Sequence, residues 1–309
     1  MIIKRKREIK LAILINKDTV VVVQGITGRE GVKTSQQMME YGTNISCGVT
    51  PGKGGAEING LKVFDSIKEA KEFDPTINTS VVYVPPLMVF DAVVEAINND
   101  IKLIVVITEN VPIKDSAKML ELAKMQNVRI IGPSSIGVMT VGVTKVGSIG
   151  GYENTSFSKG RIGVISKSGG MCSETSIILS KAGFGQSTVL GIGGDVIAGS
   201  SFVDILELFE KDSETDAICV YGEIGGKYEE QIAYAVKYGK IKKPVIAYVS
   251  GKFAETLPKT FSLGHVGAIV ERGSDSADYK RKVLRNAGVY VADFFDEIPD
   301  LVKKALASK

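Results

Sequence analysis

Residues 20–32 read VVVVQGITGREGV, and this stretch decides the fold. The four valines form a β-branched run that predicts a buried strand. Gly25 ends the run, and a polar, helix-compatible stretch extends from Arg29 to Tyr41. A strand, a glycine turn and a helix in this order are typical of a βαβ unit with a parallel sheet.

The same alternation continues on both sides of a glycine-rich, weakly periodic segment at residues 134–159. We expect further strands at 45–49, 81–84, 103–107, 129–131, 162–166, 187–192, 217–221, 245–249 and 289–291. We expect further helices at 89–98, 115–126, 171–181, 202–210, 229–238, 277–287 and 298–307. Both halves are therefore expected to be α/β with open parallel sheets, as two domains at residues 1–145 and 146–309.

Composition excludes several classes of protein. The chain has 309 residues, enough for about two domains with their own cores. Its net charge of +3 is too small to predict nucleic-acid binding, and the basic cluster at residues 4–10 is expected to be a solvated tail. No apolar run reaches the ~18 residues that a transmembrane helix needs. The 3 cysteines are far apart, which predicts reduced thiols, a cytoplasmic location and no metal site.

The loops that follow strands are the places to look for function, since ligands of parallel sheets bind at the carboxyl ends of the strands. The first loop has the spacing GxxGxxG, unlike the GxGxxG of dinucleotide sites. The position for a ribose-binding carboxylate holds Thr50-Pro51-Gly52-Lys53-Gly54-Gly55 instead. A lysine among glycines suits a phosphate, so we expect a nucleotide-type site with an extra phosphate, with a simple tight turn as the alternative. A nicotinamide-dependent dehydrogenase is disfavoured.

Three loops in the second half carry polar groups. Ser166–Met171 offers hydroxyls and a helix N-terminus to an anion, although Ser168 could simply cap the helix. Glu223 lies between glycines after a strand and is either a functional acid or an exposed turn residue. His265, the only histidine, also lies between glycines, where an imidazole could act as a base, a ligand or a phosphoryl acceptor. Metal binding is the weakest of these because no second ligand is near in sequence.

These loops carry specific motifs over nearly the whole chain. The motifs are QGITG (24–28), GVTPGKGG (48–55), VVITE (105–109), IGP (131–133), GIGGD (191–195), GEIGG (222–226) and GHVGAI (264–269). With them the chain resembles the α-type subunit of succinyl-CoA synthetase and related NDP-forming acyl-CoA ligases. The resemblance implies a Rossmann-like CoA-binding domain followed by a flavodoxin-like parallel-sheet domain. It also implies an ATP-grasp β-type partner that binds most of the ATP and magnesium, in an αβ or (αβ)2 assembly.

The resemblance also implies roles for individual residues. His265 matches the catalytic histidine that is phosphorylated by the nucleotide and passes the phosphoryl group to a carboxylate, after which the CoA sulfur attacks the acyl phosphate. Glu223 matches the glutamate that positions this histidine. The positions that match CoA contacts are Thr27, Gly28, Arg29, Glu30, Lys53, Ile107, Thr108 and Glu109. The positions that match the substrate or phosphate loop are Ser168, Gly169, Gly170 and Ser173.

The second loop departs from the succinate enzymes, which read SRSGTLTYE where this chain reads SKSGGMCSE at residues 166–174. Gly170 stands in place of threonine and Ser173 in place of tyrosine. Residues 132–137 and 149–151 also look more like ATP-citrate lyase and citryl-CoA synthetase. The smaller residues leave room for citrate, so we expect citrate as the acid, with succinate as the alternative. A non-catalytic CoA-binding paralogue is a further alternative, which the retained His265 and Glu223 disfavour.

Overall fold

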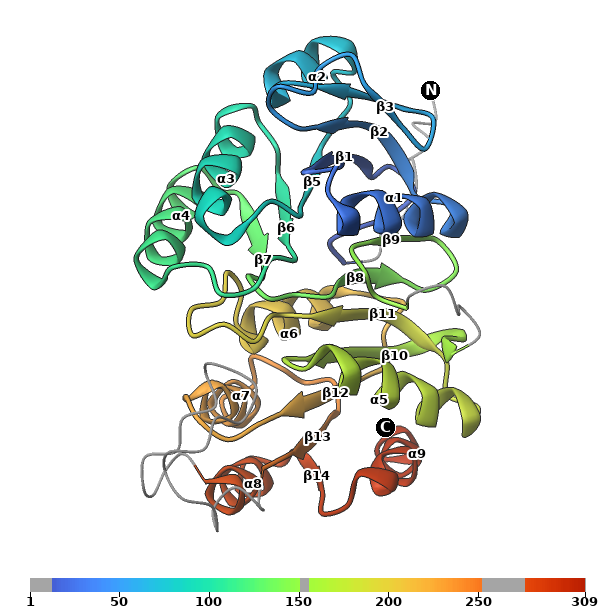
Figure 1. The fold of residues 1–309 in the computed structure, drawn as a ribbon. Helices are drawn as coiled ribbons and strands as arrows, with labels where there is room; N and C mark the ends of the chain where they lie inside the picture. Colours follow the sequence, from blue (N-terminus) through green and yellow to red (C-terminus); the bar gives the residue numbers. More distant parts are fainter. Residues whose placement is uncertain (1–12, 151–155, 252–275, 309) are drawn as a thin grey trace, which may run out of the picture.

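The computed structural model describes residues 13–150, 156–251 and 276–308, which form two sheets stacked end to end along the molecule (Figure 1). The basic cluster at residues 4–10 and His265 lie outside the described residues. Within the described part of the chain, no helix combines the length and the apolar character that crossing a membrane would require.

The first sheet contains seven strands in the order β3-β4-β2-β1-β5-β6-β7. Its strands are β1 (Val20–Gln24), β2 (Asn44–Val49), β3 (Glu57–Ile58), β4 (Leu61–Phe64), β5 (Thr79–Val82), β6 (Leu103–Val106) and β7 (Arg129–Ile131). All neighbours pair in parallel except β3, which pairs antiparallel with β4. The six parallel strands have the order 3-2-1-4-5-6 when they are counted along the chain, which is the Rossmann order.

Helices cover both faces of the first sheet. They are α1 (Arg29–Tyr41), α2 (Ile67–Phe73), η1 (Pro86–Met88), α3 (Val89–Asn98) and α4 (Ile113–Met125). Figure 1 shows α3 and α4 together on one side of the sheet and α1 on the other. Burial on both faces explains why the strands are almost continuous runs of valine and isoleucine.

The second sheet also has seven strands, in the order β14-β13-β12-β10-β11-β8-β9. Its strands are β8 (Gly137–Thr140), β9 (Thr144–Val146), β10 (Lys159–Ser166), β11 (Gln186–Gly191), β12 (Ala217–Gly222), β13 (Val245–Val249) and β14 (Tyr290–Ala292). The five strands from β10 to β14 are parallel, and counted along the chain they have the flavodoxin order 2-1-3-4-5. The expected Rossmann-like and flavodoxin-like folds are therefore confirmed.

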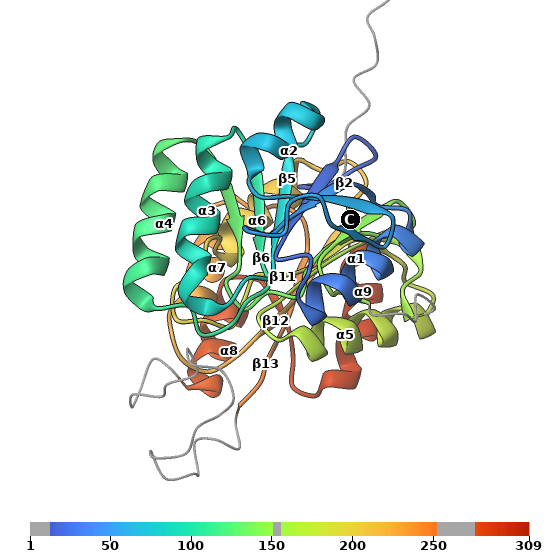
Figure 2. The ribbon, with the colours of Figure 1, turned by 45° about the horizontal axis from the view of Figure 1, so that its top comes forward.

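Helices cover both faces of the second sheet as well. They are α5 (Gly169–Lys181), α6 (Phe202–Lys211), α7 (Tyr228–Lys237), α8 (Ala277–Asn286), η4 (Phe295–Glu297) and α9 (Ile298–Ala307). In Figures 1 and 2, α5 and α9 lie together, whereas α7 and α8 lie on the opposite side. Successive residues of β10 point to opposite faces of the sheet. Val164 belongs to the core cluster that contains residues of α5 and α9, and Ile165 belongs to the cluster that contains residues of α6.

The sheets are mixed, and in this respect the expectation of parallel sheets was too simple. β8 pairs antiparallel with β11 and with β9 at one edge of the second sheet. The chain leaves the first sheet after Ile131 and joins the second at Gly137, before the domain boundary expected at residue 145. The boundary itself stays a prediction, but residues 137–146 contribute their strands to the second sheet.

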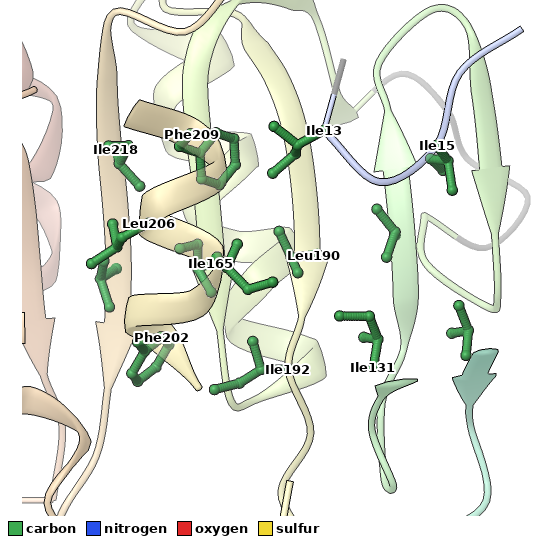
Figure 3. Packing of buried hydrophobic residues seen from close by; sticks show 14 of the residues in the cluster. Ile13, Ile15, Ile131, Ile165, Leu190, Ile192, Phe202, Leu206, Phe209 and Ile218 are labelled. Carbon is green, nitrogen blue, oxygen red and sulfur yellow. The ribbon is translucent and has the colours of Figure 1, made fainter. Parts of the chain in front are cut away.

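One core cluster joins the two sheets. It contains Val21 and Val105 of the first sheet together with Ile165, Leu190 and residues of α6. Figure 3 shows Phe202, Leu206 and Phe209 of α6 beside the strands of the second sheet, with Ile131 nearby. The continuous core fixes the two sets of strand-end loops relative to one another.

Candidate functional site

The first group of candidate residues lies where the strand order of the first sheet reverses. This reversal falls between β1 and β5, and ligands of open α/β sheets bind at such a point. A cavity of about 300 Å³ opens there, with a wall formed by Gly25, Pro51, Val84 and Met88. Its other residues come from the ends of β1 and β2, from the turn after β4 and from α3.

Each glycine of the first loop is suited to its position for a different structural reason. Gly25 has a φ of +83°, which favours glycine. A Cβ on Gly31 would lie 2.4 Å from the carbonyl oxygen of Gly25, so α1 packs directly against its own turn. Gly28 is the N-cap of α1, and no side chain caps this end of the helix. The backbone N–H groups of this turn and the positive end of the helix dipole suit an anion.

The side chains next to Gly28 differ in exposure. Thr27 Oγ1 lies 3.2 Å from Thr50 Oγ1, which joins the first and second loops. The side chains of Arg29 and Glu30 are 94% and 61% exposed, and they form a loose ion pair at 3.7 Å. Arg29 and Glu30 are therefore available at the surface beside the turn.

The loop of Lys53 folds around an aspartate that the sequence did not single out. The backbone N–H groups of Lys53 and Gly54 both donate to Asp65 Oδ1, at 3.0 and 2.8 Å. Asp65 lines the cavity, and the side chain of Lys53 is exposed. The structure thus places Lys53 next to the cavity rather than inside it.

Further carboxylates line the same cavity. Asp91 and Glu95 are on α3, and burial raises the pKa of Glu95 above its usual value. Glu95 Oε1 accepts the backbone N–H of Ile67 at 2.7 Å, and its Oε2 accepts from the Gln24 amide at 3.4 Å. An acidic cavity disfavours phosphate inside it and favours hydrogen-bond donors such as an aromatic amine.

Residues 107–109 lie beside this cavity as well. Thr108 Oγ1 donates to the carbonyl of Val84, a lining residue, at 2.7 Å. Ile107 is half-buried and Glu109 is exposed. The backbone N–H groups of Asn110 and Val111, which follow them, point to the carboxylate of Asp195 at 3.4 and 3.3 Å. The GIGGD motif of the second half is thereby connected to this loop.

The second group of candidate residues lies where the strand order of the second sheet reverses, between β10 and β12. The turn after β10 is held by Ser166, whose hydroxyl donates to Ser168 O and accepts from Ser168 N. Ser168 Oγ accepts the backbone N–H of Met171 at 3.5 Å and is the N-cap of α5. Ser168 therefore has a capping role in addition to any role toward a ligand.

Gly169 and Gly170 have different surroundings. A Cβ on Gly169 would lie 2.3 Å from Ile136 Cγ2, so this glycine allows close packing. A Cβ on Gly170 would meet no atom within 4 Å. Gly169, Gly170 and Ser173 line one cavity of about 380 Å³, together with Ser148 and Phe157. Three of the four residues predicted for the substrate loop are thus brought together.

Glu223 is buried and paired with a lysine that sequence reasoning passed over. Lys167 Nζ lies 2.7 Å from Glu223 Oε1, and the two side chains are only 3% and 9% exposed. Lys167 belongs to the turn after β10, and Glu223 comes directly after β12. The pair therefore spans the reversal point, and the interpretation of Glu223 as an exposed turn residue is wrong. The only sequence signal was a lysine within the candidate loop.

The loop of Glu223 is also fixed through its main chain. Glu229 Oε1 accepts the backbone N–H of Glu223 at 3.1 Å. Lys280 Nζ donates to the carbonyls of Glu223 and Gly225 at 2.8 and 2.5 Å. Burial of four charged groups, Lys167, Glu223, Glu229 and Lys280, requires such pairing, because an isolated buried charge is costly.

Similarity to known proteins covers both halves of the chain. Residues 16–110 match the CoA binding domain family and residues 165–290 match the CoA-ligase family. The α subunit of ADP-forming succinate–CoA ligase from Aquifex aeolicus is 44% identical over 96% of this chain and 95% of that protein. The corresponding subunit of Methanothermobacter thermautotrophicus is 42% identical over 96% of this chain and 98% of that protein.

A solved structure is also similar over both halves. It is that of ATP citrate lyase from Methanothrix soehngenii in complex with citrate and coenzyme A, with a TM-score of 0.88 and 29% sequence identity. The alignment covers 96% of this chain and 51% of that one, so this chain spans about half the length of that protein.

Proposed function

This chain belongs to the family of α-type subunits of NDP-forming acyl-CoA ligases, and from this premise we propose that it binds CoA and carries the phosphoryl group in a two-subunit acid–CoA ligase. The observation that carries the proposal is the pair of strand-order reversals. One has a cavity beside Lys53, and the other has the buried Glu223 and the loop of Ser168.

CoA is proposed to bind at the first reversal point. The walls of Val49, Pro51 and Val84 suit the flat adenine ring, and the carboxylates of Asp65 and Asp91 suit its amino group. The phosphates would stay outside this acidic cavity. There the exposed Lys53 and the uncapped N-terminus of α1 provide positive charge.

The reaction is proposed to proceed in three transfers. A nitrogen of His265 forms a bond to the γ-phosphorus of ATP while the bond to ADP breaks. A carboxylate oxygen of the acid then takes the phosphoryl group, which restores the imidazole and forms an acyl phosphate. The CoA sulfur attacks the acyl carbon and releases phosphate. ATP with magnesium would be held mainly by the β-type, ATP-grasp partner, in an αβ or (αβ)2 assembly.

The residues of the second reversal point suit the anionic groups that are transferred in these reaction steps. The N-terminus of α5 can stabilise a phosphoryl or carboxylate group, and the cavity of Gly170 and Ser173 adjoins it. Glu223 would accept a hydrogen bond from the His265 imidazole and so orient its other nitrogen. The cytoplasmic location remains a prediction, and it agrees with the free, buried state of Cys47, Cys172 and Cys219.

We propose succinate as the acid, in place of the citrate that the loop residues first favoured. The support is the 44% and 42% identity to α subunits of succinate–CoA ligase along nearly their whole length. Citrate is kept as a second candidate because of Gly170, Ser173 and the similarity to a citrate-bound structure. A few residues in one pocket typically change specificity only modestly.

The test uses this chain co-purified with its β-type partner and ATP labelled on the γ-phosphate. We expect label on the wild-type chain and none on His265→Asn, whose CoA affinity should be unchanged. We then add CoA with succinate or with citrate. Discharge of the label by succinate supports the proposal, and discharge by citrate alone favours the second candidate. A stable complex without label would favour a non-catalytic CoA-binding subunit.

A further inference from the structure

The two turns of the second reversal point are joined by the ion pair of Lys167 and Glu223. Figure 1 shows that β10 and β12, from which these turns leave, are neighbours. Lys167 Nζ also lies 5.2 Å from the centre of the Tyr228 ring. The ammonium is thus held between a carboxylate and an aromatic face, away from water, which strengthens both interactions.

Glu223 is held from two separate sides. Its carboxylate contacts Lys167, whereas its backbone N–H and carbonyl contact Glu229 and Lys280. The contacts from α7 and α8 therefore fix the main chain of the turn, and Lys167 contacts the carboxylate itself. Because only 3% of the Lys167 side chain is exposed, it offers little surface for direct contact with a ligand.

We propose that Lys167 is a positioning residue that keeps the Glu223 carboxylate ionised and in one orientation at the reversal point. The proposal rests on the function proposed above, in which Glu223 accepts a hydrogen bond from an imidazole. Only the ionised carboxylate is an obligate acceptor. Burial favours its neutral form, and a cation within hydrogen-bond distance favours the charged form.

Among the residues that the structure describes, the other charged and titratable groups near Glu223 do not replace this effect. Glu229 brings a like charge and therefore favours the neutral form of Glu223. Lys280 is paired with Glu229 and directed at main-chain oxygens. Tyr221 and Tyr228 are the neighbouring phenols, and burial is the main cause that raises the pKa of Tyr221. Removal of the Lys167 charge thus leaves two buried carboxylates with one ammonium among these groups.

The experiment measures the initial rate of labelling of the chain by γ-labelled ATP, in the complex with its partner, from about pH 5 to about pH 9. In Lys167→Met we expect the acid limb of the rate–pH profile to move to higher pH by about one unit or more, because Glu223 becomes harder to ionise. In Lys167→Arg the acid limb should lie at the same pH as in the wild type. A uniform loss of rate without a shift would make Lys167 merely structural and overturn the proposal.

Two matched variants test whether the shift of the acid limb comes from the action of Lys167 on Glu223. Lys181→Met removes a lysine from the far end of α5, and its profile should equal that of the wild type. In a Glu223→Gln background, Lys167→Met should cause no further shift of the limb. If it shifts the limb there as well, Lys167 acts through another group and the proposal is wrong.

Two further outcomes have distinct meanings. If Lys167→Met does not fold, Lys167→Gln takes its place in the pH experiment, since it retains a hydrogen-bond donor without the charge. If neither neutral variant folds, a shifted limb in Lys167→Arg would overturn the proposal, and a retained limb would support it. An unlabelled wild-type complex would instead refute the proposed function itself, and the role of Lys167 would fall with it.

Discussion

Lys280 Nζ lies 2.5 Å from Glu229 Oε2, and the two side chains are only 0% and 2% exposed. The pair joins α8 to the first turn of α7, and both side chains hydrogen-bond to the main chain of Glu223. Buried ion pairs add little net stability compared with apolar pairs, but loss of one partner leaves an uncompensated charge. The pair therefore ties the stability of the second domain to the geometry of its candidate site.

Replacement of this lysine should be strongly destabilising. We expect Lys280→Met to lower the free energy of unfolding by about 3–5 kcal/mol, because the Glu229 carboxylate stays buried without its cation. The combined change of Lys280→Met and Glu229→Leu should cost clearly less than Lys280→Met alone. Urea unfolding of the three proteins, followed by circular dichroism, measures both effects. A single variant as stable as the wild type would contradict this account of the pair.

The neighbouring glycines at the start of α5 should respond to alanine in opposite directions. Gly169→Ala should destabilise the chain by about 1–3 kcal/mol, because the new methyl would overlap Ile136. Gly170→Ala should be neutral or stabilise by about 0.5–1 kcal/mol, since the site is open and alanine favours a helix. Each variant is the control for the other in the same unfolding experiment. Equal losses at both positions would show that the loop is more tightly packed than described.

The strand–helix alternation could be predicted from the sequence, but the strands at and near the sheet edges could not. α1, α3, α9, β7 and β13 begin and end at the predicted residues, because long periodic or β-branched runs leave little ambiguity. β3, β4, β8 and β9 were missed, since they are short and interrupted by glycine turns. β8 also starts at Gly137, where a Cβ would lie 2.0 Å from Val146 O, a constraint set by the partner strand.

For the candidate site, the loops could be predicted but their internal pairing could not. Parallel topology alone brings the turns of Gly25, Ser168 and Glu223 to strand ends. The pairing of Lys167 with Glu223, and of the Lys53 loop with Asp65, depends on how distant segments meet in space. A single lysine or aspartate carries no sequence signal for such a partner. The predicted role of His265 stays a prediction, because the residue lies outside the described part of the chain.

The three cysteines should be unreactive in the folded protein. Cys47, Cys172 and Cys219 are free and buried, and burial raises the pKa of Cys47 to about 11 and that of Cys172 to about 12. Since the thiolate is the reactive form, we expect negligible reaction with a disulfide reagent at about pH 8 without denaturant and three thiols after unfolding. Rapid reaction of one thiol in the native chain would show that its site opens.

Lys53 provides the sharpest test of the first site. Its backbone is fixed by Asp65 while its side chain is exposed, so the charge can be removed without disturbing packing. We expect Lys53→Ala to weaken CoA binding about tenfold, as loss of one charge-assisted contact to a phosphate predicts, with the unfolding free energy unchanged. Lys33→Ala is the control, because Lys33 is an exposed lysine farther along α1.

Calorimetry with CoA and with dephospho-CoA measures the effect of Lys53→Ala. If the lysine meets the 3′-phosphate, dephospho-CoA should bind the two proteins equally. If it meets the diphosphate, both ligands should bind the variant more weakly. Unaltered affinity for both would remove Lys53 from the site.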